Sequence, residues 1–363
     1  MINILKDSIK IQSYKDESKI GDYYVSILKS HGFTVLTQIV TGKRKNIFAI
    51  KNKNDKKRSI LFYGHMDTVH PVEGFENPFE PRISGNKLYG LGSYDMKGGI
   101  AAFLSAAKDS NKYIKVFLAV GEEDISDGGW HAFNNNKSFF DDVSLVISAE
   151  PNFDLGLNGI TTGRTGRVIF DLISIGKAVH IAKQSEGIDS IQKITEFIQK
   201  IYDPKIKKKF NSKKTVVQIR KIKGESVGMS VCSMCSAKIE VLLGPGDSVE
   251  STLKIFRSMI EDKNVTSVEL AKRSTPYLEG YNFESFPYQE EISKIIKNFT
   301  KKDMKLHQRS SVGDDNIFGA NGIPIITWGP DGANAHTNNE WVDIKSLNIL
   351  QEMYKEFLLR FEE

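Results

Sequence analysis

The stretch LFYGHMDTV (residues 61–69) runs from apolar residues directly into a histidine and an aspartate, His65 and Asp67. The apolar part has the composition of a buried β-strand, because large apolar residues at successive positions leave neither face for water. Polar side chains at the end of such a strand either meet solvent or belong to a site. Which of the two applies depends on the rest of the chain.

Similar short apolar runs recur along the chain and predict a sheet. They are NIFAI (46–50), SILFYG (59–64), IKVFLAVG (114–121), VSLVISA (143–149) and IPIITWG (323–329). Short runs rich in Val, Ile and Phe are typical of buried strands in a mostly parallel sheet. Helical stretches such as KGGIAAFLSAAKDS (97–110) separate several of them. The predicted fold class is therefore α/β, with helices on both faces of a mostly parallel sheet.

The middle of the chain has a different order of elements. Between residues 164 and 273, strand and helix patterns follow the order β-α-β-β-α-β, which is that of a ferredoxin-like domain. The α/β pattern resumes afterwards. The sequence thus predicts a larger domain of residues 1–163 and 274–363, into which residues 164–273 are inserted.

Composition excludes several classes of protein. The 363 residues are 40% hydrophobic and 26% charged, and no apolar run reaches the roughly 18 residues that span a bilayer. Charges spread over residues 1–19 argue against a secretory signal. The only cysteines, Cys232 and Cys235, fit a reducing cytoplasm, and their CSMC spacing at the start of an apolar strand favours packing over a zinc or redox site. The net charge of +5 comes from scattered lysines, so we expect neither a nucleic-acid nor a membrane partner.

Acidic residues or histidine follow three of the predicted strands. The residues at these strand ends are His65 and Asp67, Glu122 and Glu123, and Glu150. In open α/β sheets the carboxyl ends of parallel strands meet at one edge, where ligands bind. Several carboxylates close together need a cation. Imidazole and carboxylate suit zinc, or cobalt or manganese in the same site.

Two loop residues are expected to reach the same edge. Asp95 lies in the glycine-rich stretch YGLGSYDMKGG (89–99), and His336 lies in GPDGANAHTNNEW (329–341), after the last strand. Glycines let the backbone approach closely, so the two oxygens of Asp95 could bridge two metal ions. Each feature alone fits a surface histidine, a helix-start charge pair or a turn. Their convergence at one sheet edge favours a metal site.

With these residues assembled, the sequence resembles the M20 family of metallo-hydrolases. That family includes acetylornithine deacetylase, succinyl-diaminopimelate desuccinylase and glutamate-releasing carboxypeptidases. The resemblance covers nearly the whole chain, and its motifs are GHMDTV (64–69), LYGLGSYDMKGG (88–99), GEED (121–124), AEP (149–151), GKAVH (176–180) and AHTNNE (335–340). It implies a dizinc exopeptidase-like catalytic domain with an inserted lid domain.

The resemblance also implies a ligand set. In the family pattern, His65 and Glu150 bind one zinc, Glu123 and His336 bind the other, and Asp95 bridges the two. A cis peptide bond is implied between Asp95 and the residue that follows it.

Three further roles follow from the same resemblance. Asp67 would orient the metal-binding His65, Glu122 would be the general base that takes a proton from the metal-bridging water, and His180 would stabilise the oxyanion. A homodimer formed through the inserted domain is implied as well.

The substrate is less sharply defined. Glutamate at position 150 accompanies deacylases and carboxypeptidases in this family, which implies an N-acyl amino acid or a short peptide as substrate. Arg164 and Arg167 are candidate carboxylate clamps, with hinge or surface arginines as the alternative. GMSVCSMCS (228–236) departs from the family's lid segment, and Asp314 and Asp315 in GDDN receive no role.

Taken together, the sequence predicts a cytoplasmic, dizinc-dependent amide hydrolase that cleaves an N-acyl amino acid of lysine, ornithine, arginine or diaminopimelate metabolism. Two other enzymes remain open. One releases lysine or ornithine from an amino-group carrier protein, and the other is a glutamate-type metallocarboxypeptidase. An inactive relative that acts as a binding module is the alternative from another class, although Glu122 and all five metal ligands are present.

Overall fold

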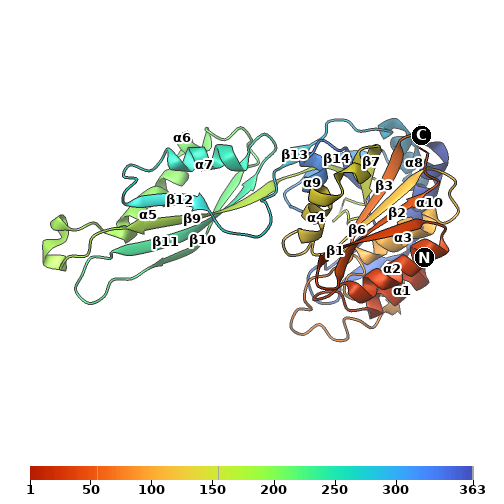
Figure 1. Cartoon of the computed structure of the whole chain (residues 1–363), viewed down its shortest axis with the longest axis horizontal. Helices are drawn as coiled ribbons and strands as arrows, with labels where there is room; N and C mark the ends of the chain where they lie inside the picture. Colours follow the sequence, from red (N-terminus) through yellow and green to blue (C-terminus); the bar gives the residue numbers. More distant parts are fainter. Residues whose placement is uncertain (55, 154, 362–363) are drawn as a thin grey trace. The chain divides into compact units, whose positions relative to one another are not determined.

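The computed structural model describes residues 1–54, 56–153 and 155–361. The chain forms two compact units (Figure 1). The first unit consists of residues 1–163, 283–308 and 313–363, and the second of residues 164–282 and 309–312.

The first unit is built on a large sheet. Its neighbouring strands, in spatial order, are β1 (Thr34–Thr41), β2 (Arg44–Lys51), β6 (Ile114–Ala119), β3 (Ser59–His65), β7 (Val143–Ser148), β15 (Ile325–Thr327) and β8 (Gly159–Arg164). Four adjacent strands, β6, β3, β7 and β15, run parallel. Every residue of β3, β6 and β7 is buried, as the apolar runs predict.

The strand formed by NIFAI is the exception to the parallel arrangement. It lies in β2, which runs antiparallel to both β1 and β6. Only two residues separate β1 from β2, and Gly42 in that turn has φ +56°. A two-residue connection can join only antiparallel strands, because a parallel crossover needs a dozen or more residues.

Helices cover both faces of this sheet (Figure 1). One face carries α1 (Ile2–Lys10), α2 (Ser18–Ser30), α3 (Lys97–Ala107), α8 (Gln289–Thr300) and α10 (Ile344–Arg360), and the other carries α4 (Asp127–Asn135) and α9 (Asp315–Ala320). The first group encloses the main hydrophobic core, in which α3 is buried on nearly all sides. On the face that carries α4 and α9, Phe117 and Phe318 pack edge to face against neighbouring rings, and Phe133 stacks on Phe140.

A small sheet of short strands positions two loops of the site. Its order is β16 (Gly332–Ala333), β17 (Trp341–Asp343), β5 (Lys87–Tyr89) and β4 (Arg82–Ser84), and all its pairs are antiparallel. The loop that carries Asp95 follows β5, and the loop that carries His336 joins β16 to β17. Pairing of Trp341 with Tyr89 therefore brings the two loops together.

The second unit has the element order β-α-β-β-α-β. Its elements are β9 (Gly166–Ile175), α5 (Ser190–Ile201), β10 (Val216–Gly224), β11 (Met234–Leu243), α7 (Val249–Arg257) and β12 (Thr266–Leu270). The antiparallel sheet has the order β10-β11-β9-β12, and α5 and α7 contribute to a separate hydrophobic core with it. This is the arrangement expected of a ferredoxin-like fold. The unit extends beyond the predicted end at residue 273, to residue 282.

Shorter elements complete the chain. They are η1 (Lys137–Phe140), η2 (Ile181–Glu186), α6 (Pro204–Lys207), β13 (Tyr281–Asn282) and β14 (Lys305–Arg309). Within the described ranges, no helix is both long and apolar enough to cross a membrane.

Candidate active site

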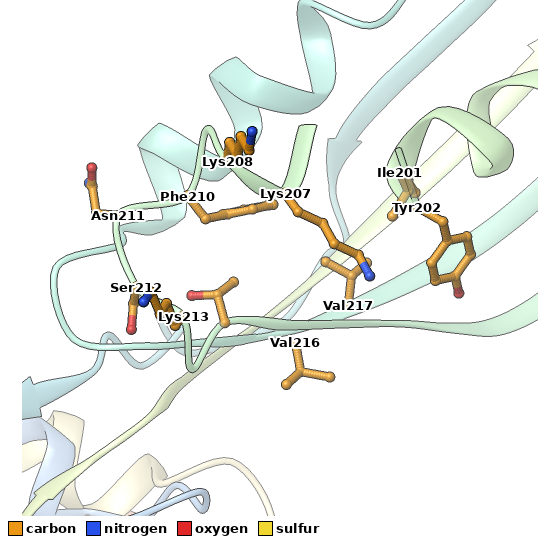
Figure 2. A pocket seen from close by; sticks show the side chains of 11 residues that line it. Ile201, Tyr202, Lys207, Lys208, Phe210, Asn211, Ser212, Lys213, Val216 and Val217 are labelled. Atoms are coloured by element: carbon orange, nitrogen blue, oxygen red, sulfur yellow. The ribbon is translucent and has the colours of Figure 1, made fainter. Parts of the chain in front are cut away.

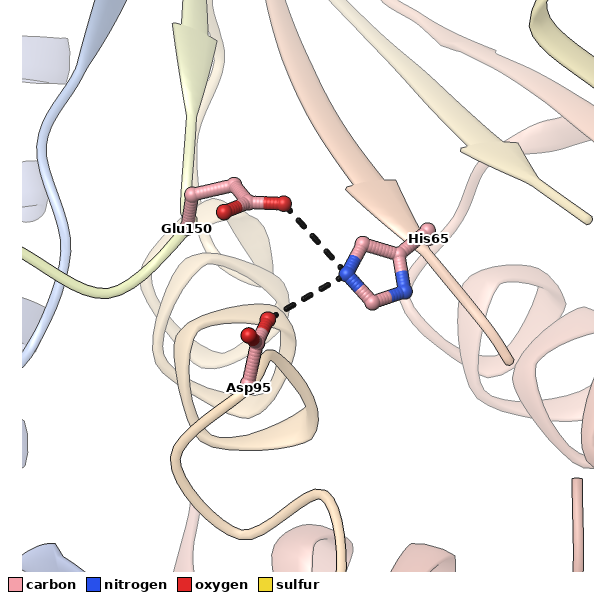
Figure 3. A group of neighbouring side chains, drawn as sticks. All are labelled: His65, Asp95 and Glu150. Carbon is pink, nitrogen blue, oxygen red and sulfur yellow. Dashed lines mark hydrogen bonds and ion pairs between the residues drawn. The ribbon is translucent and has the colours of Figure 1, made fainter. Parts of the chain in front are cut away.

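His65 ends strand β3 and is completely buried. Its Nε2 lies 3.3 Å from Oδ1 of Asp95 and 3.3 Å from Oε1 of Glu150 (Figure 3). Its Nδ1 lies 3.1 Å from the backbone oxygen of Asp67. Because a carbonyl oxygen can only accept, Nδ1 carries a proton, and Nε2 is the ring nitrogen that could bind a metal ion among the carboxylates.

Asp95 joins two groups of side chains that could bind metal ions. The His65 set consists of His65, Asp95 and Glu150, and the His336 set consists of Asp95, Glu123 and His336. Within each set the ligand atoms lie within 4.8 Å of one another. Asp95 directs Oδ1 toward His65 and Oδ2 to within 3.2 Å of Nε2 of His336. One carboxylate shared in this way fits a pair of bridged ions, and the donor types fit zinc.

The parallel strands explain why these residues meet. His65 pairs with Ala119 of β6, and Tyr63 pairs with Ser148 of β7, so the three strands end at the same edge. Glu123 and Glu150 follow β6 and β7 within a few residues. The bond between Asp95 and Met96 is cis, as the resemblance implied.

His336 reaches the site from a strained loop. It has φ +61°, an uncommon conformation for a residue with a side chain. Its Nε2 lies 3.0 Å from Oε1 of Glu123, and about half of its side chain is exposed. The His336 set is therefore the more accessible of the two sets.

Asp67 does more than the sequence pattern predicted. Its carboxylate accepts the backbone N–H of Glu122 (3.2 Å) and of Glu123 (2.9 Å). Nδ1 of His65 lies 3.5 Å from Oδ1 of Asp67 but only 3.1 Å from the backbone oxygen of Asp67. The backbone oxygen of Asp67 is thus the nearer partner of His65, its carboxylate makes a longer contact to the same nitrogen, and that carboxylate also holds the turn that carries Glu122 and Glu123.

Glu122 lies beside the His65 set. Its Oε2 is 4.0 Å from Nε2 of His65, and its side chain is 9% exposed. Burial raises the pKa of Glu122 well above its usual value. A carboxyl group in this position, beside a candidate set of metal ligands, lies where a general base would be needed.

The carboxylates of the site lie close together and need positive charge to offset their repulsion. Burial raises the pKa of Glu123 to about 7. Hydrogen bonds to Asp95 and Glu123 raise the pKa of His336 to about 11. Protons thus offset the crowded carboxylates, and a divalent cation in each set would offset them more strongly.

The other predicted residues lie in the second unit. His180 is exposed, and its Nδ1 accepts the N–H of Ala182 at 3.2 Å, which leaves Nε2–H as a donor in the neutral ring. Arg164 is buried and donates to Ser311 Oγ at 3.4 Å.

Arg167 already has an acidic partner. Its Nε lies 2.6 Å from Oε1 of Glu240 on the neighbouring strand, and Arg220 lies 3.4 Å from the other oxygen of Glu240. This pairing fits the alternative of a structural arginine better than that of a substrate clamp.

The second unit also contains a cavity of about 610 Å³ (Figure 2). Apolar side chains such as Phe210 and Val217 line it together with Lys207, Lys208 and Lys213. Its lining includes no histidine, cysteine or carboxylate, so it offers no set of metal ligands.

Two buried acids near the site were missed by sequence reasoning. Asp314 accepts the Tyr63 hydroxyl at 2.9 Å, and burial raises the pKa of Asp314 to about 7. Glu340 accepts three backbone N–H groups of the loop that carries Asp95. Both occur in stretches already noted, GDDN and AHTNNE, but residue type alone did not indicate their partners.

Comparison with known proteins identifies the family. The sequence model of peptidase family M20/M25/M40 matches residues 61–360. The chain is 24% identical over 375 residues to a succinyl-diaminopimelate desuccinylase of Nautilia profundicola, covering 98% of this chain and 99% of that protein. A desuccinylase of Helicobacter pylori (strain Shi470) is 26% identical over 312 residues, covering 82% and 79%.

Solved structures share the fold. An aminopeptidase PepT from Bacillus cereus has a TM-score of 0.81 at 20% identity, covering 98% of this chain and 96% of that chain. An M20 metallo-carboxypeptidase from Sulfolobus solfataricus has a TM-score of 0.74 at 17% identity, covering 98% of each. A dinuclear metal-binding M20 peptidase from Bacillus subtilis has a TM-score of 0.70 at 14% identity, covering 99% and 96%. The chain belongs to peptidase family M20/M25/M40 and is a metal-dependent hydrolase of amide bonds.

Proposed function

We propose that this protein is a dizinc hydrolase that removes the acyl group from an N-acyl amino acid, as a desuccinylase or deacetylase does. The observation that carries the proposal is the pair of ligand sets joined through Asp95, with Glu122 buried beside them. The desuccinylase of Nautilia profundicola, similar over 98% of this chain, supports the substrate class. The dinuclear metal-binding peptidase of Bacillus subtilis, which shares the fold, is consistent with two ions.

The His65 set and the His336 set would hold the two zinc ions. When bound, the ions would supply Lewis acidity, which polarises the amide carbonyl and acidifies water. Asp95, which belongs to both sets, would be a ligand common to the two.

Glu122 would move the proton. It would take a proton from the attacking water at a carboxylate oxygen and return it to the nitrogen of the leaving amine. Its backbone is held by Asp67, so the carboxyl group stays beside the His65 set in both steps. Burial alone would keep Glu122 protonated, and nearby cations lower its pKa toward the range where it can accept and return a proton.

His180 would stabilise the negative oxygen that develops on the substrate carbonyl. The hydrogen bond from Ala182 to Nδ1 leaves Nε2–H to donate, which is the tautomer that such a role requires. The homodimer implied by the family resemblance stays a prediction.

The nature of Glu150 is the reason to favour an N-acyl amino acid over an aminopeptidase substrate. The alternatives are a carrier protein that bears lysine or ornithine and a peptide with a C-terminal glutamate. Each presents an amide next to a free carboxylate or an amino-acid side chain, so the same ligand sets would serve them.

A hydrolysis screen of the zinc-loaded protein tests the proposal. The panel compares N-succinyl-diaminopimelate, N-acetylornithine and N-acetyllysine with carrier-linked lysine, dipeptides ending in glutamate, and tripeptides. Release of free amine is measured, with Glu122→Gln as the blank. We expect the highest kcat/KM for an N-acyl amino acid. Preference for tripeptides would refute the substrate class, and a two-zinc protein that hydrolyses none of these would indicate a binding module.

A further inference from the structure

Glu340 makes an unusual set of contacts with the loop that carries Asp95. It is 1% exposed and directly precedes β17. Its Oε2 accepts the backbone N–H of Gly92 at 2.7 Å, and its Oε1 accepts those of Tyr94 and Asp95, each at 2.9 Å. These three N–H groups converge on both oxygens of one buried carboxyl group, so neither oxygen is left without a hydrogen-bond partner.

The backbone of Glu340 holds the same loop. Its carbonyl oxygen accepts the N–H of Gly90 at 3.1 Å, next to the β-pairing of Trp341 with Tyr89. Gly92 has φ +76°, and a Cβ there would lie 2.6 Å from Cγ2 of Thr68. The loop therefore has little freedom to find other acceptors for its N–H groups, and loss of the carboxylate would leave them buried and unsatisfied.

The loop between β16 and β17, which carries Glu340, also carries a candidate metal ligand. His336 and Glu340 lie four residues apart in the loop between β16 and β17. Within that loop, Asn334 Nδ2 donates to the backbone oxygen of Asn339 at 3.2 Å. One loop thus contributes a ligand directly through His336 and holds the shared ligand, Asp95, through Glu340.

We propose that Glu340 is a positioning residue for the two-metal site: it fixes the backbone of Asp95 so that one oxygen reaches each ligand set. The inference rests on the proposed dizinc function and adds a residue to it that touches no ligand atom of either set. Because Asp95 belongs to both sets, loss of Glu340 is expected to weaken both ions, whereas loss of His336 removes a ligand from one set.

The test uses the metal-free full-length chain titrated with zinc alone. Glu340→Ala should weaken binding of both ions by about 10- to 100-fold, the usual effect of losing a residue that supports metal ligands. Glu340→Gln should fall between Ala and wild type. Its oxygen can still accept from Tyr94 and Asp95, but its NH₂ group would face the N–H of Gly92.

Asp247→Ala is the matched control. Asp247 is 4% exposed and accepts the backbone N–H of Asn211 (2.7 Å) and Ser212 (3.2 Å), so it holds a loop of the second unit in the same manner. The structure places no ligand of either set on that loop. The control should lose stability without losing zinc affinity.

Hydrogen exchange of the metal-free variants gives a second readout. Protection of the amides of Gly92, Tyr94 and Asp95 should fall in Glu340→Ala and partly in Glu340→Gln, and should persist in Asp247→Ala. Unchanged protection and unchanged zinc affinity in the Glu340 variants would overturn the inference, as would an equal loss of affinity in Asp247→Ala. If the wild type fails to bind two zinc ions, the dizinc proposal is refuted, and exchange alone then decides whether Glu340 positions Asp95.

Discussion

Replacing Asp67 with alanine should weaken the two metal sites unequally. The carboxylate accepts N–H groups of Glu122 (3.2 Å) and Glu123 (2.9 Å), whereas the ring N–H of His65 is bound by the backbone oxygen of Asp67, which alanine keeps. Loss of the negative charge weakens attraction to both ions. Loss of the two hydrogen bonds, however, frees only the turn that carries Glu123.

The size of the difference follows from those hydrogen bonds. A hydrogen bond involving a charged group contributes about 1.5–3 kcal/mol, and relaxation of the turn recovers part of the loss. We therefore expect a difference between the two sets near the low end of that range, about 1.5 kcal/mol, which is about tenfold in affinity. The His336 set should be the more weakened.

Single-set proteins make the difference measurable. Glu150→Ala leaves the His336 set, and His336→Ala leaves the His65 set. Zinc dissociation constants are measured for each of these with and without Asp67→Ala, by competition with a chelator. Equal losses in both backgrounds, or a larger loss in the His65 set, would refute the reasoning and restore the view that the carboxylate mainly orients His65.

Three further outcomes are expected. Glu122→Gln should lower kcat by at least about 10²- to 10⁴-fold, the contribution of a general base, while two zinc ions stay bound by elemental analysis; substantial remaining activity would remove Glu122 from the role of base. His180→Ala should lower kcat by about 10- to 1,000-fold, as loss of an oxyanion donor does, with little change in zinc content. An unchanged kcat would exclude His180 from the mechanism. Zinc affinity of the His336 set should rise with pH by about tenfold per pH unit above about pH 7, because the raised pKa of His336 means that zinc must displace a proton there. The rise should be steeper below about pH 7, where Glu123 also carries a proton. Calorimetry showing a flat profile would contradict this.

Local sequence patterns predicted the core strands well. The runs that became β3, β6 and β7 are buried throughout, and a strand buried on both faces must be apolar at successive positions. β1 (Thr34–Thr41) was not predicted, because its side chains are largely exposed and its sequence mixes Thr and Gln with Val and Ile. The direction of β2 depended on its short connection to β1, which the apolar pattern does not record.

The candidate ligands were also predictable from the chain alone. Residues of the right type follow predicted parallel strands, and the rules for such sheets place those ends at one edge. His65, Glu123 and Glu150 meet there for that reason. The family resemblance supplied the pairing of Asp95 with both sets, and the two oxygens of Asp95 lie accordingly.

The sequence by itself therefore determined the fold class and the kinds of side chain that gather at the sheet edge, since both follow from local apolar patterns and the rules of parallel sheets. Only the tertiary structure decided which atoms bond. It assigned the ring N–H of His65 to the backbone of Asp67, paired Arg167 with Glu240, and brought Glu340 to Asp95 across 245 residues of sequence. A hydrogen bond requires atoms about 3 Å apart in the right direction, and that geometry is set by strand register and loop packing, not by residue type.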